Sequence, residues 1–370
     1  MSNRNLLILG LIAGITVFLA VLLSGISNRP QEATTMAASY LIQGLDPDQI
    51  TKITVGTGSE GELVSLTRRG ANFVVSNKDN YPALVSEINK LITACLDIKT
   101  SELYTNNPEN FKDLGVEEDT GRIIVKFYKS APAKPGEDGS LLTGVVIGKQ
   151  KDKGGLGYIR RVDDNKVYVM ASQIPWIKKR PVDYIDQQLT SVKREDIEFV
   201  TVSGPNDSYT LKPGIGEKGV LLDNLPEGKK LKETVANGVF TALADLRFDD
   251  VNSEASRKDL KFDSKFVCRL KDSTLYTIPL AKQDNNWFAK CAATFMDITP
   301  VTKTQGQVES EEELKKKEIK LLARDAAEEF SEKHQGWVYQ ISRYQAENLT
   351  KPLSELLEDI SPPDEPNGVD

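Results

Sequence analysis

The segment "DQITKITVG" (residues 48–56) decides the fold, because a similar segment, "EDIEFVTVSG" (residues 195–204), follows far downstream. Ile50 of the first segment corresponds to Ile197 of the second, 147 positions later. Both segments have the β-branched residues and partial alternation of a short strand that ends at a glycine turn. The recurrence indicates that this strand, and the lobe around it, is present twice.

Three further segments recur in the same order, as an internal duplication requires. They are "LITACLDIK" (91–99) with "VFTALADLR" (239–247), "KDLGV" (112–116) with "KDLKF" (258–262), and "KVYVM" (166–170) with "WVYQI" (337–341). The separation stays near 147 positions for the first two pairs and rises to 171 for the last. This increase predicts an insertion late in the second copy, and "ESEEELKKKEIKLLARDAAEEFSEKHQ" (309–335) has no counterpart in the first.

Each copy has the pattern of an α+β lobe. Short β-rich segments such as "NFVVS" and "GRIIVKFYK" are separated by turn residues, and the later ones follow one another without intervening helices. They therefore predict a largely antiparallel sheet. The segment "YPALVSEINKLITACL" predicts the main helix, because its apolar residues recur at helical spacing. Those residues are Leu84, Val85, Ile88, Leu91, Ile92, Cys95 and Leu96.

The predicted architecture is an N-terminal transmembrane helix followed by two tandem related α+β lobes, each a mostly antiparallel sheet with one main helix. Its predicted limits are 1–28 for a cytoplasmic stub and anchor, 29–45 for a linker, 46–192 and 193–361 for the two lobes, and 362–370 for a disordered tail. The insertion occupies about 308–335 of the second lobe.

The insertion has the pattern of a charged helix, because three glutamates each stand four residues before a lysine, a favourable helical pairing. Its apolar positions form a thin stripe of Leu314, Leu321, Leu322, Ala326 and Phe330. We interpret the segment as a helix that lies on its own lobe. The alternative is a docking surface for a partner protein.

The N-terminal run from Leu6 to Leu23 has 18 residues without a charge. Such a helix nearly crosses the hydrocarbon core of a bilayer, which is about 30 Å thick. The run is longer than a secretory signal core of about 7–15 residues and lacks a good small-residue cleavage site after it. We therefore expect a retained signal anchor, single-pass in the inner (cytoplasmic) membrane, with the bulk of the chain in a bacterial periplasm.

Composition excludes some functions. The net charge of −7 and pI near 5.2 argue against nucleic acid as a partner, because phosphate binding needs a concentrated basic face. His334 is the only histidine in the 370 residues, and we expect it at a solvated helix end, away from any nucleophile. The sequence predicts no catalytic residue, no cofactor and no metal site. The tryptophans in "IPWIKK" and "GWVYQ" are expected to pack in the sheets.

The three cysteines are scattered, which excludes a four-cysteine metal cage. Cys95 falls on the apolar stripe of the first helix and is expected to be a buried thiol. Cys268 and Cys291 lie in successive strand-like segments of the second copy. In an oxidising compartment these two could form a disulfide, or both could remain reduced.

Several motifs together resemble a bacterial family catalogued as a domain of unknown function, DUF4340. They are "FVVSNKDNYPALVSEINKLITACLDI", "NFKDLGV", "VVIGKQKDKGGLGYIRRVDDNKVYVM" and "RPVDYIDQQL". The resemblance covers roughly residues 70–260 and rests on packing and turn positions. Members often occur near gliding-type ABC-2 transport components, so the resemblance implies an accessory role at the membrane and assigns no catalytic residue.

The sequence thus favours a non-enzymatic, membrane-anchored extracytoplasmic protein that binds or scaffolds another envelope or transporter protein. One alternative is an envelope carbohydrate-active hydrolase, which would need two carboxylates about 5–10 Å apart in a cleft. Another is a solute-binding component with a ligand-sized pocket between the lobes.

Overall fold

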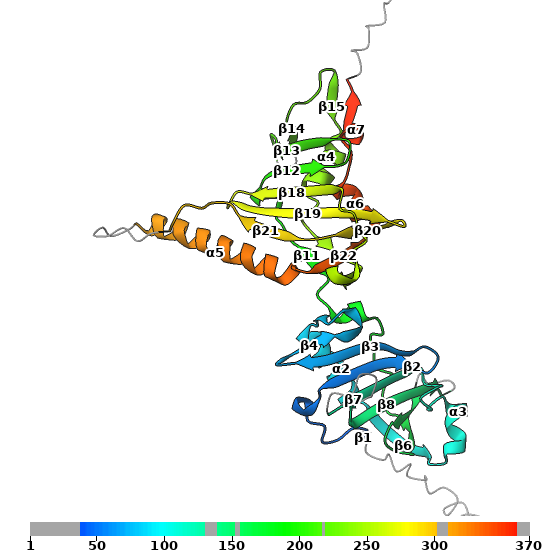
Figure 1. Cartoon of the computed structure of the whole chain (residues 1–370). Helices are drawn as coiled ribbons and strands as arrows, with labels where there is room; N and C mark the ends of the chain where they lie inside the picture. Colours follow the sequence, from blue (N-terminus) through cyan, green and yellow to red (C-terminus); the bar gives the residue numbers. More distant parts are fainter. Residues whose placement is uncertain (1–37, 130–138, 152–155, 217–218, 302–309, 361–370) are drawn as a thin grey trace, which may run out of the picture. The chain divides into compact units, whose positions relative to one another are not determined.

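The computed structural model describes residues 38–129, 139–151, 156–216, 219–301 and 310–360. The chain divides into two compact units (Figure 1). The first contains the chain up to Ser65 together with Ile88–Lys179, and the second contains Leu66–Glu87 together with the chain from Arg180 onward. This division differs from the predicted lobe limits, because the second unit takes up residues 66–87 and 180–192.

The predicted anchor, Leu6 to Leu23, the predicted linker up to residue 37 and the tail 362–370 lie outside the described residues. Within the described ranges, no helix is both long enough and apolar enough to span a bilayer.

The first unit is built on an antiparallel sheet. Its order is β1 (Ser39–Tyr40), β6 (Lys99–Thr105), β10 (Val167–Met170), β9 (Gly157–Arg161), β8 (Leu141–Gln150), β7 (Ile123–Tyr128), β2 (Lys52–Thr57) and β3 (Gly61–Arg69), whose residues from Leu66 onward belong to the second unit. The helical elements are η1 (Pro47–Gln49), α2 (Val85–Leu96), η3 (Pro108–Asn110) and α3 (Phe111–Leu114). The buried face of α2 consists of Ile88, Leu91, Ile92 and Cys95, whereas Leu84 and Val85 of the predicted stripe are exposed.

The second unit is built on a sheet in the order β14 (Val220–Leu222), β13 (Ser208–Pro213), β12 (Ile197–Ser203), β18 (Ser264–Leu270), β19 (Thr274–Gln283), β20 (Asn286–Ala289), β22 (Trp337–Ile341) and β17 (Asp250–Ser253). In addition, β21 (Ala292–Phe295) pairs with β19. Two small ladders join β11 (Gln188–Thr190) to β16 (Leu246–Arg247) and β15 (Lys229–Leu231) to β23 (Leu357–Asp359).

The helices of the second unit are α4 (Glu233–Phe240), α5 (Glu311–His334), α6 (Arg343–Leu349) and α7 (Leu353–Leu356), with the short turns η4 (Pro181–Tyr184), η5 (Arg194–Asp196) and η6 (Glu254–Ser256). Both units are mostly β-sheet with few helices, which agrees with the predicted α+β class.

The segment 66–87 carries β4 (Asn72–Val75), η2 (Ser76–Lys78) and β5 (Tyr81–Pro82). Polar contacts connect it to β17 and η6. The Asp79 carboxylate accepts hydrogen bonds from the Ser253 N–H at 2.7 Å and the Ser256 hydroxyl at 2.8 Å, and these bonds lower the pKa of Asp79. Lys78 forms an ion pair with Asp250 at 2.6 Å. These contacts explain why the segment belongs to the second unit.

The two large sheets share one strand order. It is β4-β3-β2-β7-β8-β9-β10-β6 in the first sheet and β14-β13-β12-β18-β19-β20-β22-β17 in the second. These strands also follow one another in the same sequence along the chain in the two sheets, apart from the added β21.

The cross-strand register is shared as well. At the centre, Ile53 pairs with Phe127 in the first sheet, and Val200, 147 positions after Ile53, pairs with Cys268 in the second.

Near the edge, Tyr168 is flanked by Ile159 and Leu103. Its recurring counterpart Tyr339, 171 positions later, is flanked by Ala289 and Val251. Residues that recur in the sequence therefore occupy matching positions in the two ladders.

The sheets differ in one connection. In the first, β9 leads into β10 through a tight turn of residues 162–166. In the second, the chain between β20 and β22 contains β21 and the helix α5 instead. The charged segment of the sequence is therefore added at a turn, outside the strands that the two sheets have in common.

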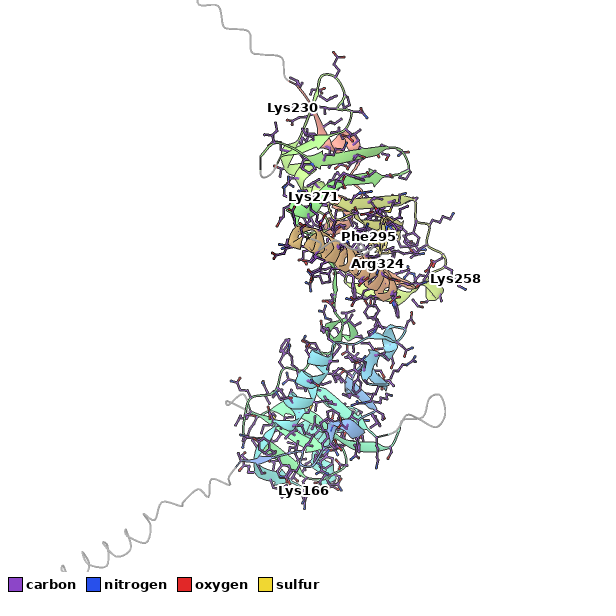
Figure 2. The ribbon with its side chains drawn as sticks, turned by 90° about the vertical axis from the view of Figure 1, so that its left-hand side faces the viewer. Lys166, Lys230, Lys258, Lys271, Phe295 and Arg324 are labelled. Carbon is purple, nitrogen blue, oxygen red and sulfur yellow. The ribbon has the colours of Figure 1, made fainter. Side chains whose placement is uncertain are left out.

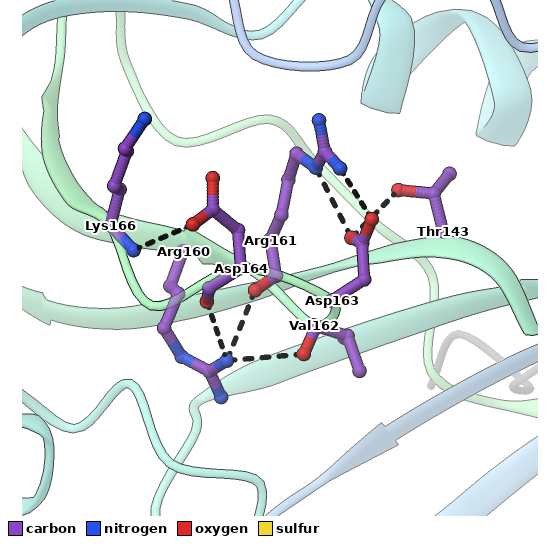
Figure 3. A network of polar contacts seen from close by, with 7 residues as sticks. All are labelled: Thr143, Arg160, Arg161, Val162, Asp163, Asp164 and Lys166. Atoms are coloured by element: carbon purple, nitrogen blue, oxygen red, sulfur yellow. Dashed lines mark hydrogen bonds and ion pairs between the residues drawn. The ribbon is translucent and has the colours of Figure 1, made fainter. Parts of the chain in front are cut away.

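The tight turn of the first unit is held by a buried arginine (Figure 3). Nη1 of Arg160 donates to the carbonyl oxygens of Arg161, Val162 and Asp164 at 3.0–3.2 Å, and its Nε donates to the Val116 carbonyl at 2.9 Å. Burial lowers the pKa of this guanidinium. The next arginine, Arg161, instead forms a more exposed ion pair with Asp163.

Candidate functional site

The added helix α5 begins with a complete capping box. The Ser310 hydroxyl accepts the Glu313 N–H, and the Glu313 carboxylate accepts the Ser310 N–H at 2.9 Å. The helix lies along β21 (Figure 1), and its N-terminal end extends past the tips of β19 and β21.

The buried face of α5 differs from the predicted one. The buried residues of the helix are Ala323, Ala327 and His334. Because the two alanines are small, the helix can lie close to β21. The Ser331 hydroxyl donates to the Ala293 carbonyl at 2.6 Å and accepts the Ala293 N–H at 2.9 Å. The Ser331 side chain thus satisfies the backbone N–H and carbonyl of Ala293 at the edge of β21, where a neighbouring strand would otherwise pair.

The leucines of the predicted stripe point to solvent. Leu314 is 53% exposed and Leu322 is 61% exposed, with Leu321 less so, and Ile319 is 50% exposed. Large apolar residues gathered on one exposed helix are typical of an interaction surface. We call the exposed side chains of Leu314, Ile319, Leu321 and Leu322 the α5 apolar surface.

A pocket of about 630 Å³ lies between α5 and β21. Arg324 and Glu328 of the helix and Phe295 of the strand line it, and Figure 2 shows Arg324 and Phe295 on the same side of this unit. Lys320 fastens the helix beyond this pocket, through an ion pair with Asp297 at 2.7 Å that lowers the pKa of the Asp297 carboxyl to about 2.

His334 is buried, which corrects the prediction of a solvated helix end. Its Nδ1 is 2.7 Å from the Tyr339 hydroxyl, which is 3.4 Å from the Tyr81 hydroxyl. The imidazole also packs against the ring of Phe330 at 4.4 Å between centroids. The sequence misleads here because Lys333 and Gln335, which flank this histidine, are polar.

Burial lowers the pKa of His334 to about 4, with a smaller contribution from Lys333. Because an unfolded histidine titrates near pH 6.5, the unfolded chain binds a proton between pH 6.5 and 4 that the folded chain does not. We expect the free energy of unfolding to fall by about 3 kcal/mol across this window as the pH is lowered. Urea unfolding at a series of pH values measures it.

The His334→Gln variant is the control, because the chain has no other histidine. Carboxylates also titrate in this range and affect both proteins alike. Between pH 6.5 and 4 the free energy of unfolding of the variant should therefore fall less than that of the unmodified protein, by the contribution of His334. An unchanged pH profile in this variant would contradict the assignment.

A second pocket, of about 770 Å³, lies in the second unit, within the size range of ligand sites. We call it the α4–α6 pocket. Segments far apart in sequence form it: the start of η4, the C-terminal half of α4, the β16–β17 turn and α6. Its lining includes Arg180, Gln187, Gly238, Thr241, Asp245, Arg247, Phe248, Asp249, Ser342, Tyr344, Gln345 and Asn348.

Both guanidiniums of this pocket are paired with a carboxylate. Arg180 donates to both oxygens of Asp183, at 3.2 and 2.6 Å, and this pairing raises the pKa of the guanidinium. Arg247 lies 3.8 Å from the Asp245 carboxylate, which also accepts from Gln188 at 3.1 Å. Two carboxylates, Asp245 and Asp249, line the pocket, and that of Asp245 already has Arg247 and Gln188 as partners.

Across the described parts of the chain, no three histidine, cysteine or carboxylate groups are close enough together to hold an ion.

The cysteines are buried free thiols. Cys268 of β18 lies opposite Tyr276 of β19, and Tyr276 in turn lies opposite Ala293 of β21, two residues after Cys291. One strand therefore separates the two cysteines. Two strand spacings amount to about 9–10 Å, beyond the Cα separation that a disulfide tolerates. The possible Cys268–Cys291 disulfide is absent from this arrangement.

Burial raises the pKa of Cys95 and Cys268 to about 12 and that of Cys291 further still. Since the thiolate is the reactive form, we expect no labelling of the native protein by a thiol reagent near neutral pH. After unfolding in guanidinium without reductant, all three thiols should react. Recovery of a single thiol would indicate a disulfide.

Trp176 is the aromatic residue that sequence reasoning placed wrongly. It is 89% exposed, although a strand-packed position was expected. Its neighbour Ile177 is buried, so this tryptophan is held outward at a fixed point of the chain between β10 and η4.

A family model described as a domain of unknown function (DUF4340) matches residues 74–265, which is more than half of the chain. The match contains the β9–β10 turn and most of the α4–α6 pocket and ends before α5. No curated protein and no solved structure matches the chain. The chain belongs to the DUF4340 family.

Proposed function

We propose that this protein is a non-enzymatic, membrane-anchored extracytoplasmic scaffold that binds another envelope or transporter protein. In this proposal its two lobes arose by tandem duplication. The docking element is the chain added between β20 and β22, which consists of β21 and the predicted insertion with its helix α5. The common strand order and register of the two sheets support the duplication.

The placement of the insertion carries the docking proposal. The first sheet joins β9 to β10 through a short turn, so a sheet of this order is complete without any added helix. The second sheet places a 24-residue helix at the same point, and this helix exposes leucines at Leu314 and Leu322. Large apolar side chains gathered on one helix cost solubility and do not serve the sheet, so we assign the α5 apolar surface to contact with a partner.

The membrane anchor and the accessory role in ABC-type transport rest on the uncharged run Leu6–Leu23 and on the resemblance to the family. The anchor is tested by washing membranes with carbonate. A retained anchor keeps the full chain in the pellet, whereas release into the wash would overturn this part of the proposal.

Site-specific photocrosslinking tests the docking element. A benzophenone amino acid is placed at Leu322, and in a control chain at Leu221, an exposed leucine of β14 in the same unit. In native membranes we expect a crosslinked envelope or transporter protein from position 322 and none from 221. Identical products from both positions, or none from position 322, would contradict docking on α5.

A further inference from the structure

The α4–α6 pocket carries an inference that is independent of docking on α5. Its lining is polar, and it contains two guanidiniums, Arg180 and Arg247, and two carboxylates, Asp245 and Asp249. Each guanidinium already has a carboxylate partner, Asp183 or Asp245. An anionic ligand would have to displace these partners, and an apolar ligand would leave the polar lining without hydrogen bonds. The lining therefore suits a neutral, polar ligand.

The hydrogen-bonding groups of the lining indicate which class of neutral, polar ligand fits the pocket. The guanidiniums donate, the carboxylates accept, and Gln187 and Asn348 do both through planar amides. A ligand hydroxyl can donate and accept at once, and neighbouring hydroxyls match the two-pronged geometry of such planar groups. Tyr344, at the start of α6, is 75% exposed and presents its ring for stacking against the C–H face of a sugar.

A helix glycine keeps this pocket open. Gly238 lies inside α4, where glycine costs about 1 kcal/mol relative to alanine. A Cβ at this position would meet only Asn348 Oδ1, at an ordinary contact distance of 3.6 Å. Packing therefore tolerates alanine there, and helix stability would favour it. Neither packing nor helix stability therefore requires glycine at position 238. A ligand that occupies the space in front of this residue would require it, because a side chain there would take up part of that space.

We propose that the α4–α6 pocket binds a neutral glycan, with Tyr344 stacking on a sugar ring and the Arg, Asp and amide groups bonding its hydroxyls. The site needs no contribution from α5. A tethered protein with this pocket would hold a polysaccharide strand near the membrane.

The test uses the full chain, solubilised in a detergent without a sugar headgroup, and two soluble neutral probes, tetra-N-acetylchitotetraose and maltotetraose. Calorimetry or NMR titration should detect binding of at least one probe in the micromolar to millimolar range. The Gly238→Leu variant, whose side chain fills the pocket, and Tyr344→Ala should each weaken binding by about tenfold or more. Tyr104→Ala removes an exposed tyrosine of the first unit and should leave binding unchanged.

Folding is controlled with Gly238→Ala, which should keep or raise the melting temperature. Its retained fold shows that a side chain at position 238 is tolerated, so loss of binding in Gly238→Leu reports on the pocket, provided this variant also melts cooperatively. Three outcomes would overturn the proposal: no binding of either sugar at millimolar concentration, binding that neither variant weakens, or preferential binding of tetra-alanine or inositol hexakisphosphate.

Discussion

Replacing Arg160 with methionine is expected to lower the free energy of unfolding of the first unit by about 3–5 kcal/mol. Methionine keeps most of the volume but removes every donor. The carbonyls of Arg161, Val162 and Asp164 at the turn, and that of Val116 just after α3, then lose their shared partner. The stacking of the guanidinium on Phe111, at 4.9 Å, is lost as well. Urea unfolding monitored by circular dichroism measures the change.

Arg161→Ala is the matched control, because it removes the neighbouring arginine. Its ion pair with Asp163 is partly exposed, and such pairs contribute about 0–1 kcal/mol. Equal losses in the two variants would show that burial of Arg160 in the turn has no special weight, which contradicts the role assigned to it.

Replacing Gly148 with alanine is expected to destabilise the same unit by about 3 kcal/mol. Gly148 lies in β8 directly against the end of α3. A Cβ there would lie 2.9 Å from the Gly115 carbonyl oxygen, 2.7 Å from Val116 Cγ1 and closer still to the Leu114 carbonyl oxygen. Two of these neighbours are backbone atoms, so the clash can be relieved only by moving α3 away from the sheet. A thermal melt measures the loss.

Gly157→Ala provides the comparison within the same motif. Its Cβ would meet the flexible side chain of Ile174 at 3.2 Å, which can move. We expect a loss well below that of Gly148→Ala. A Gly148→Ala protein as stable as Gly157→Ala would mean that α3 does not lie against β8 as described.

Gly148 and Arg160 both belong to the segment "VVIGKQKDKGGLGYIRRVDD", which is one of the segments that carry the resemblance to the family. Gly148 and Arg160 serve the packing of α3 and the closure of a turn. The family signature in this segment therefore reports the fold of the lobe, which explains why it offers no reactive residue.

The sequence predicted the sheets well because strand pairing depends on local patterns. Ile53 and Val200 recur 147 positions apart in the sequence and lie on the corresponding strands β2 and β12. Tyr168 and Tyr339 recur 171 positions apart and lie on the corresponding strands β10 and β22. The change of separation near residue 309 located the insertion for the same reason. The division into units was less predictable, because Asp79 joins its hairpin to Ser253 through hydrogen bonds between distant segments.

The face of α5 could not be read from hydrophobicity. The helix approaches β21 through Ala323 and Ala327, whose value lies in small size, while the larger Leu314 and Leu322 remain outside. The α4–α6 pocket was missed because its lining is assembled by tertiary structure. Gly238, in the middle of α4, is the one local feature of the sequence that could have indicated it.

The most direct test of the account removes the insertion. Residues 291–336 are replaced by Arg-Val-Asp-Asp-Asn, the first-copy sequence from Arg161 to Asn165, so that the strand before Cys291 leads into Trp337 through a tight turn. We predict that the shortened protein still unfolds cooperatively, though less stably because His334 and Phe330 are gone, and that it loses its partner in native membranes. A shortened protein that fails to fold, or one that keeps the partner, would contradict the claim that the insertion is dispensable for the sheet and required for docking.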